Sequence, residues 1–185
     1  MSVSKWQGYS AEVSKRLQSG GYSADSAAAL LDFDAEMFRL MRSIVKGELP
    51  AQLMSEMGQG LDLAQFQALT AIMRLQGGIG GRDPQEATVG LVAAELNVDP
   101  SRASRIVSDL IGAGLLRRDV SQSDGRKSIL NLTHSATALL LAFRDLKWAK
   151  TMQVFANWTE AEICSFSQLF LRYNEGMRAA YPSRD

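Results

Sequence analysis

The segment spanning residues 97–127 constrains the fold of this chain more than any other. Asp99 is a suitable helix N-cap, and Pro100 follows at the first helical position, where its missing N–H is not needed. From there apolar residues recur at helical spacing and form one stripe: Ala103, Ile106, Val107, Leu110 and Ile111. The opposite side carries hydroxyls and arginines: Ser101, Arg102, Ser104, Arg105 and Ser108. The pattern predicts a helix that packs on one side and presents a polar, basic surface on the other.

A β-hairpin is predicted directly after this helix, which is expected to end at Gly112 and Gly114. The runs LLRRDV and KSILNLT are typical of strands. The second run alternates between two sides, with Leu130 and Leu132 on one and Ile129 and Asn131 on the other. SQSDGR joins the two runs, and its Asp-Gly pair favours a tight hairpin turn.

A shorter helix is predicted immediately upstream, in TVGLVAAELNV. Thr88 is a suitable N-cap, and Asn97 tolerates the left-handed backbone that a sharp exit requires. The inward side of this helix is apolar: Val89, Val92, Ala93 and Leu96. Two short helices joined by a turn of about three residues form a helix-turn-helix, and the hairpin extends it to a winged helix.

The order of these elements favours DNA binding, although each element alone has a plainer interpretation. A helix with Arg and Ser on its outer side is usually just a solvated helix, and a D-G-R loop is common in hairpins. In a winged helix, the hydroxyls and arginines of the helix over 100–112 would lie in the major groove, where hydroxyls suit phosphates or bases and arginine binds guanine. Arg126 would enter the adjacent minor groove with Asp124 orienting it, and Lys127 would contact a phosphate.

Five short motifs follow one another between Thr88 and Thr133. They are V-G-L-V-A-A-E-L at 89–96, S-R-A-S-R-I-V-S-D-L at 101–110, G-L-L-R-R at 114–118, D-G-R at 124–126 and L-N-L-T at 130–133. In type and order they resemble the winged-helix domain of the MarR family of bacterial transcriptional regulators. This chain differs from the family pattern just after L-N-L-T, where the family often has a Gly and this chain has His134, Ser135, Ala136 and Thr137.

The resemblance implies a homodimeric transcriptional regulator, acting as a repressor on a pseudo-palindromic operator in double-stranded DNA. It also implies a cleft between the dimerisation helices and the DNA-binding domain, which in many relatives admits small aromatic or phenolic acids. No motif marks that cleft, so the effector-binding residues stay unassigned. The family also has oxidant sensors with a reactive Cys near the N-terminal helix. Cys164 instead lies beside an apolar stripe of the last helix, where a buried, inert thiol is expected.

Amphipathic helices on both sides of the winged segment predict dimerisation. Their apolar stripes run from Leu30 to Ile44, from Leu139 to Met152 and from Ile163 to Met177. The winged segment is too small to cover all three, and an identical chain is the simplest partner. The predicted fold is mainly α, with a small β-hairpin wing. Residues 1–23 form an arm or short helix, 24–60 and 134–180 a helical dimerisation region, and 61–133 the winged helix-turn-helix DNA-binding domain.

Local signals predict where the flanking helices begin and end. Gly47 and Pro50 are expected to stop the helix that begins at Ala24. Thr133 is expected to cap the first helix after the hairpin, and Thr159 with a Glu three residues on has the pattern of a capping box. The glycine-rich GGIGGRDPQEA is expected to be a flexible linker, because a phosphate-binding loop needs a preceding strand and usually a Lys-Ser/Thr pair.

The composition of the chain restricts which kinds of function and which cellular compartment are expected. Twenty basic and twenty acidic side chains give a net charge of zero, whereas residues 97–127 hold six basic and four acidic side chains, or +2. One Cys and one His argue against a disulfide framework, a Cys- or His-based metal site and any cofactor held by them. No apolar run is long enough to span a bilayer and the first residues do not resemble a signal peptide, so a cytoplasmic protein without membrane contact is expected.

Two other classes of function are weighed against DNA binding. The main alternative is a winged helix used for protein interaction or assembly, without sequence-specific DNA binding and with its basic side simply solvated. An enzyme is disfavoured because no His, Cys and carboxylate cluster and no phosphate-binding loop is visible, and no catalytic residue is assigned. Retardation of genomic DNA fragments in a gel would separate the first two classes.

Overall fold

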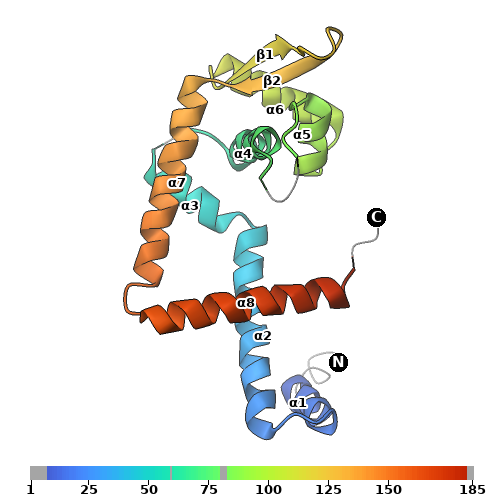
Figure 1. Cartoon of the computed structure of the whole chain (residues 1–185), viewed down its shortest axis with the longest axis vertical. Helices are drawn as coiled ribbons and strands as arrows, with labels where there is room; N and C mark the ends of the chain where they lie inside the picture. The colour runs from blue at the N-terminus through green and yellow to red at the C-terminus, as the bar shows by residue number, and fades with distance from the viewer. Residues whose placement is uncertain (1–7, 59, 80–82, 183–185) are drawn as a thin grey trace, which may run out of the picture. The chain divides into compact units, whose positions relative to one another are not determined.

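The computed structural model describes residues 8–58, 60–79 and 83–182, and in them the chain forms helices and a two-stranded hairpin (Figure 1). They divide into two compact units, residues 1–63 and 64–185. The first unit holds α1 (Tyr9–Ser19), α2 (Ala24–Val45) and α3 (Glu48–Glu56). α4 (Leu63–Gly77) begins at the boundary, and the second unit continues with α5 (Val89–Leu96), α6 (Pro100–Gly112), β1 (Leu116–Val120), β2 (Ser128–Leu132), α7 (His134–Val154) and α8 (Glu160–Ala180). The mainly helical fold with a β-hairpin is confirmed.

In the first unit, the segment that the sequence left open between an arm and a short helix is helical as α1. Residues 1–7 of that segment lie outside the described residues. The Ser23 hydroxyl accepts the Ser26 N–H at 3.1 Å and caps α2, which packs against α1. Ala27 is fully buried, and it is the only residue that α2 buries.

The helix α3 was not predicted, because Gly47 and Pro50 were taken only as the end of α2. Gly47 has a left-handed backbone (φ 69°), which suits the residue between two helices. Pro50 then falls in the first turn of α3, where the backbone N–H groups have no intrahelical partner. The same two residues therefore end one helix and begin the next.

The core of the second unit joins both helices of the helix-turn-helix to α4 and the hairpin. Its largest fully buried side chains are Leu69, Ile72, Val92, Val107, Leu110 and Leu130. Phe66 of α4 contacts Phe143 of α7, with ring centroids 4.4 Å apart. The hairpin lies beside α6, which contacts β1, and α7 begins next to β2 (Figure 1).

Both predicted caps of the C-terminal helices are confirmed. The Thr133 hydroxyl accepts the Ala136 N–H at 3.2 Å and begins α7. At the start of α8 the Thr159 N–H donates to the Glu162 carboxylate at 2.7 Å, while the Thr159 hydroxyl accepts the Glu162 N–H at 3.3 Å. The backbone hydrogen bond from Thr159 holds the pKa of the Glu162 carboxyl below its usual value.

The apolar stripes of α2 and α8 are exposed in the single chain, whereas in the stripe of α7 Leu140 is buried and Phe143 is half-buried. α8 buries no residue, and its stripe leaves Phe166 45% and Phe170 46% exposed. Leu40, Met41 and Ile44 of α2 are exposed to a similar degree. None of the described helices is both long and apolar enough to cross a membrane.

The prediction that Cys164 is a buried thiol is wrong for the single chain, in which Cys164 is exposed. Its neighbour Ile163 belongs to the apolar stripe, but successive helical residues point about 100° apart. Cys164 therefore faces away from the stripe that was expected to cover it.

Candidate nucleic-acid interface

The helix-turn-helix is built from caps and a turn that the sequence specifies locally. The Thr88 hydroxyl accepts the Leu91 N–H at 3.2 Å and begins α5. Asn97 ends this helix in the left-handed conformation, with φ 52° and ψ 48°, and is the only non-glycine described residue with a positive φ. Asp99 accepts the Arg102 N–H at 2.9 Å and begins α6 with Pro100 in its first turn.

The two sides of α6 are divided as predicted, except that Ile111 at the end of the predicted apolar stripe is only half-buried. Ala103, Ile106, Val107 and Leu110 are buried, because α6 packs against α5 and β1. On the other side Ser101, Arg102, Arg105 and Ser108 are exposed, while Ser104 is half-buried. A hollow of about 560 Å³, open to solvent, follows this side and is lined by Pro100, Ser101, Ser104, Arg105, Ser108 and Asp109. Packing on one side thus fixes which side chains α6 presents outward.

The hairpin pairs in the antiparallel register Leu116↔Leu132 to Val120↔Ser128. At its base the Thr133 N–H donates to the Leu115 carbonyl at 3.1 Å. Neighbouring Ile129 and Leu130 of β2 are both buried, so both faces of the strand are covered at this point. Arg117 and Arg118 in β1 are exposed.

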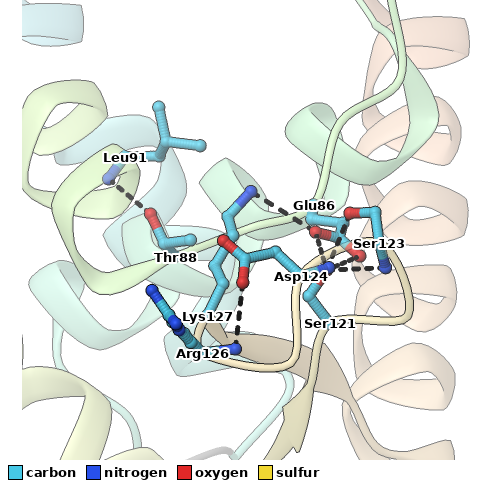
Figure 2. Close-up of polar contacts among 8 residues, drawn as sticks. All are labelled: Glu86, Thr88, Leu91, Ser121, Ser123, Asp124, Arg126 and Lys127. Carbon is cyan, nitrogen blue, oxygen red and sulfur yellow. Dashed lines mark hydrogen bonds and ion pairs between the residues drawn. The ribbon is translucent and has the colours of Figure 1, made fainter.

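The loop that joins the strands, residues 121–127, is closed by a four-residue turn. The Lys127 N–H donates to the Asp124 carbonyl at 2.9 Å, so Gly125 and Arg126 lie at the centre of the turn. The Asp124 carboxylate accepts the backbone N–H of Arg126 at 3.0 Å (Figure 2). This contact is typical of an Asx turn: it shapes the backbone that carries Arg126, whereas the sequence suggested a contact that orients the guanidinium.

Lys127, the predicted phosphate contact, has a partner within the protein. Its ammonium lies 3.3 Å from the Glu86 carboxylate, and the same carboxylate accepts a hydrogen bond from the Ser121 hydroxyl (Figure 2). Sequence reasoning assigned no role to Glu86 or Ser121. No local pattern marks them, because 35 residues separate them in the chain.

A second polar network joins α4 to the strands. The Gln76 amide donates to the Asn131 side-chain oxygen at 2.8 Å, and Asn131 donates to the Asp119 carboxylate at 2.6 Å. Arg117 lies 3.4 Å from the same carboxylate. The hairpin is therefore held by Gln76, which precedes the glycine-rich segment, and by Glu86 near the end of that segment.

The sequence predicted a flexible linker over GGIGGRDPQEA, but the end of this segment is held by backbone hydrogen bonds. Residues 80–82 lie outside the described residues. At its end the Gln85 N–H donates to the Leu75 carbonyl at 2.9 Å, and the Ala87 carbonyl accepts the Leu130 N–H at 2.8 Å. The backbone around Glu86 is thus tied to α4 on one side and to β2 on the other.

The predicted interface residues lie on two neighbouring elements of the second unit, α6 and the hairpin loop. Together they offer hydroxyls, guanidinium groups and one ammonium, which are donors that suit phosphates and base edges. In the part of the chain that the structure describes, no three His, Cys, Asp or Glu residues gather in a way that could hold a metal ion.

Residues 59–127 match the family model described as the MarR family. No curated protein matches the chain. Among solved structures, a MarR family protein from Bacillus stearothermophilus has a TM-score of 0.61 at 16% identity, covering 79% of this chain and 96% of its own. The YusO protein from Bacillus subtilis has a TM-score of 0.59 at 21% identity, covering 83% of this chain and 99% of its own.

MepR of S. aureus is similar in fold as well. A mutant of MepR bound to an oligodeoxyribonucleotide has a TM-score of 0.54 at 17% identity, covering 77% of this chain and 96% of its own. MepR bound to ethidium bromide has a TM-score of 0.56 at the same identity, covering 77% and 95%. Residues 59–127 therefore match the MarR family model, and the chain has the fold of the MarR family structures already solved.

Proposed function

We propose that this protein is a transcriptional repressor that binds a pseudo-palindromic DNA operator as a homodimer. The observation that carries the proposal is the outward side of α6, with its exposed arginines and hydroxyls next to a loop tipped by Arg126. In a winged helix these are the parts that meet the major groove and the adjacent minor groove. The oligodeoxyribonucleotide bound by a MepR mutant, a protein of the same fold, supports this assignment.

The exposed apolar stripes support the homodimer. Phe166, Leu169 and Phe170 of α8 form an exposed apolar stripe, and contiguous apolar surface of this kind marks sites of protein association. A second copy of the chain would cover the stripe by twofold symmetry. The same symmetry would place two copies of α6 about 34 Å apart, the length of one turn of DNA.

Gel retardation of fragments from the genome of the source organism tests the proposal directly. A DNA-binding repressor is expected to retard a small subset of fragments in the presence of excess unrelated DNA. If no fragment is retarded at low salt, where the phosphate contribution is greatest, the winged helix serves protein interaction instead.

Replacing Arg126 by Ala is expected to weaken operator binding by about 1–3 kcal/mol, the range for one good arginine contact. The side chain is exposed at the centre of the turn, and Asp124 contacts only the backbone there, so the fold should be unchanged. Fluorescence anisotropy with a labelled operator measures the loss. Arg16→Ala in α1 removes the same charge elsewhere and is the control; equal binding by Arg126→Ala and wild type would exclude the loop as a DNA contact.

Arg102→Ala and Arg105→Ala are expected to differ in kind from Arg126→Ala. An arginine that contacts a base relaxes the choice of sequence at that base, whereas a phosphate contact lowers affinity for all sequences together. Binding to a set of operators with single base changes separates the two results. Unchanged affinity and unchanged sequence preference in both variants would mean that α6 does not lie in the groove.

Release from DNA is expected to follow binding of a small aromatic molecule rather than oxidation of Cys164. The ethidium bromide bound by MepR supports a ligand of this kind for the shared fold. Cys164 is exposed, yet it is the single cysteine of the chain, so it cannot form an intramolecular disulfide. Such a ligand must bind the DNA-incompetent form more tightly than the DNA-binding form. A ligand with equal affinity for both forms does not change the equilibrium between them.

The measurement is operator binding by wild type and Cys164→Ser with peroxide, beside wild type with aromatic acids and with ethidium. The proposal expects peroxide to leave both proteins bound and at least one aromatic ligand to release wild type. Release of wild type but not of Cys164→Ser by peroxide, with no effect of any aromatic ligand, would contradict it.

A further inference from the structure

Ser121 is the one buried polar side chain in the described part of the chain, only 4% exposed. Its hydroxyl oxygen lies 2.9 and 2.8 Å from the two carboxylate oxygens of Glu86. A hydroxyl has one hydrogen, so Ser121 donates to Glu86 and its oxygen is left to accept. It lies 3.2 Å from the N–H groups of both Ser123 and Asp124, and 2.9 Å from the Ser123 hydroxyl. Glu86 thus orients the hydroxyl around which the loop is folded.

The carboxylate that does this is held on a fixed backbone. The residues before and after Glu86 are hydrogen-bonded to Leu75 of α4 and Leu130 of β2. The Glu86 side chain is 31% exposed, so it is partly shielded from water. A hydrogen bond to a carboxylate is stronger than one between neutral groups, and more so where water is partly excluded.

The same carboxylate also holds the far end of the loop. The Lys127 ammonium lies 3.3 Å from Glu86, and the Lys127 carbonyl accepts the Ser121 N–H at 2.9 Å. Glu86 therefore contacts the residues at which the loop begins and ends, while Arg126 extends away from it (Figure 2). The lysine side chain is 42% exposed, so solvent screens this ion pair and a phosphate can replace the carboxylate.

We propose that Glu86 is a positioning residue for the hairpin loop, and that it competes with DNA phosphate for Lys127. Through Ser121 it keeps residues 121–127 in the conformation that presents Arg126. Through its charge it holds Lys127 in an ion pair until DNA binds. Because this ion pair must be broken, the affinity of the protein for any DNA backbone is lower. The proposal rests on the proposed function only for its DNA part, because the conformation of the loop can be measured without DNA.

Two substitutions at Glu86 separate these roles and are expected to act in opposite directions. Glu86→Gln keeps an oxygen that can accept from Ser121 but removes the charge that holds Lys127. Operator binding should strengthen because Lys127 no longer has an ion pair to give up, and the slope of log affinity against log salt should stay unchanged because Lys127 contacts a phosphate in both complexes. Glu86→Ala removes the acceptor, so the loop loosens and binding should weaken about tenfold, within the range for loss of one arginine contact.

Two matched controls isolate the mechanism. Glu12→Gln makes the same change of net charge on the exposed surface of α1 and should leave affinity and salt slope at the wild-type values. In the double variant Glu86→Gln with Lys127→Ala, the gain should vanish, so that it binds like Lys127→Ala alone. A gain that survives the loss of Lys127, or that appears in Glu12→Gln, would overturn competition for the lysine.

Hydrogen exchange of the DNA-free protein tests the positioning role. The amides of Ser123, Asp124 and Lys127 should be protected in wild type and in Glu86→Gln, and should exchange faster in Glu86→Ala. Glu86→Ala with wild-type protection and wild-type affinity would overturn the positioning role. If wild type binds no operator, the proposed function fails and the competition with DNA fails with it, while loop exchange still decides whether Glu86 fixes the conformation.

Discussion

Replacing Phe170 by Asp is expected to dissociate the proposed dimer into monomers at micromolar concentration and to abolish operator binding at the same time. Phe170 lies in the apolar stripe of α8 with its ring 5.9 Å from that of Phe166, and it is 46% exposed in the single chain. In a twofold interface a single substitution acts twice. In the dimer the exposed part of the Phe170 ring would be buried, and losing that burial costs about 1 kcal/mol per copy. A charge placed in an apolar interface costs about 1–3 kcal/mol more. The dimer should weaken by roughly a thousandfold or more.

Sedimentation measures the change, and the same helix provides its control. Gln168→Asp introduces the same charge two residues earlier, about 200° around α8, and should leave the dimer intact. Far-ultraviolet circular dichroism should report similar helix content in both variants if the substitution acts on assembly. A dimeric Phe170→Asp protein, or a folded wild-type monomer at micromolar concentration, would show that α8 does not join two subunits.

Leu110→Ala is expected to lower the free energy of unfolding by about 2–5 kcal/mol, the range for truncating a fully buried leucine. Leu110 is completely buried, on the side of α6 that packs in the core of the second unit. The loss combines the apolar area returned to water with the cavity left behind. Because this packing decides which side chains α6 presents outward, the variant should also bind the operator more weakly near its unfolding midpoint.

Urea unfolding at one fixed protein concentration gives the difference, because a dimer would make stability depend on concentration. Leu171→Ala makes the same chemical change at a leucine that is 60% exposed, and it should change stability by about 0.5 kcal/mol or less. Equal losses in the two variants would mean that Leu110 is not part of a packed core.

The helix ends and helix sides near the interface could be predicted because their causes are local. Thr88, Asp99, Thr133 and Thr159 each cap a helix through a hydrogen bond to the third residue after them. The buried side of α6 follows from a spacing repeated within one helix. The same local rules gave wrong predictions where one sequence pattern is compatible with two structures. Gly47 and Pro50 end α2 and also begin α3, and Cys164 follows an apolar residue yet faces the other way.

The sequence by itself determined the winged-helix arrangement and the outward residues of α6, since these depend on neighbours within one or two turns. Only the tertiary structure decided what holds the hairpin loop, because its contacts join residues far apart in the chain. Ser121 reaches Glu86 across 35 residues, Lys127 reaches it across 41, and Gln76 reaches Asn131 across 55. No periodicity encodes such pairs. They arise where the packing of α4, α6 and β2 brings the backbone of Glu86 beside the loop, so that its carboxylate contacts the buried Ser121 hydroxyl and the lysine at the end of the loop.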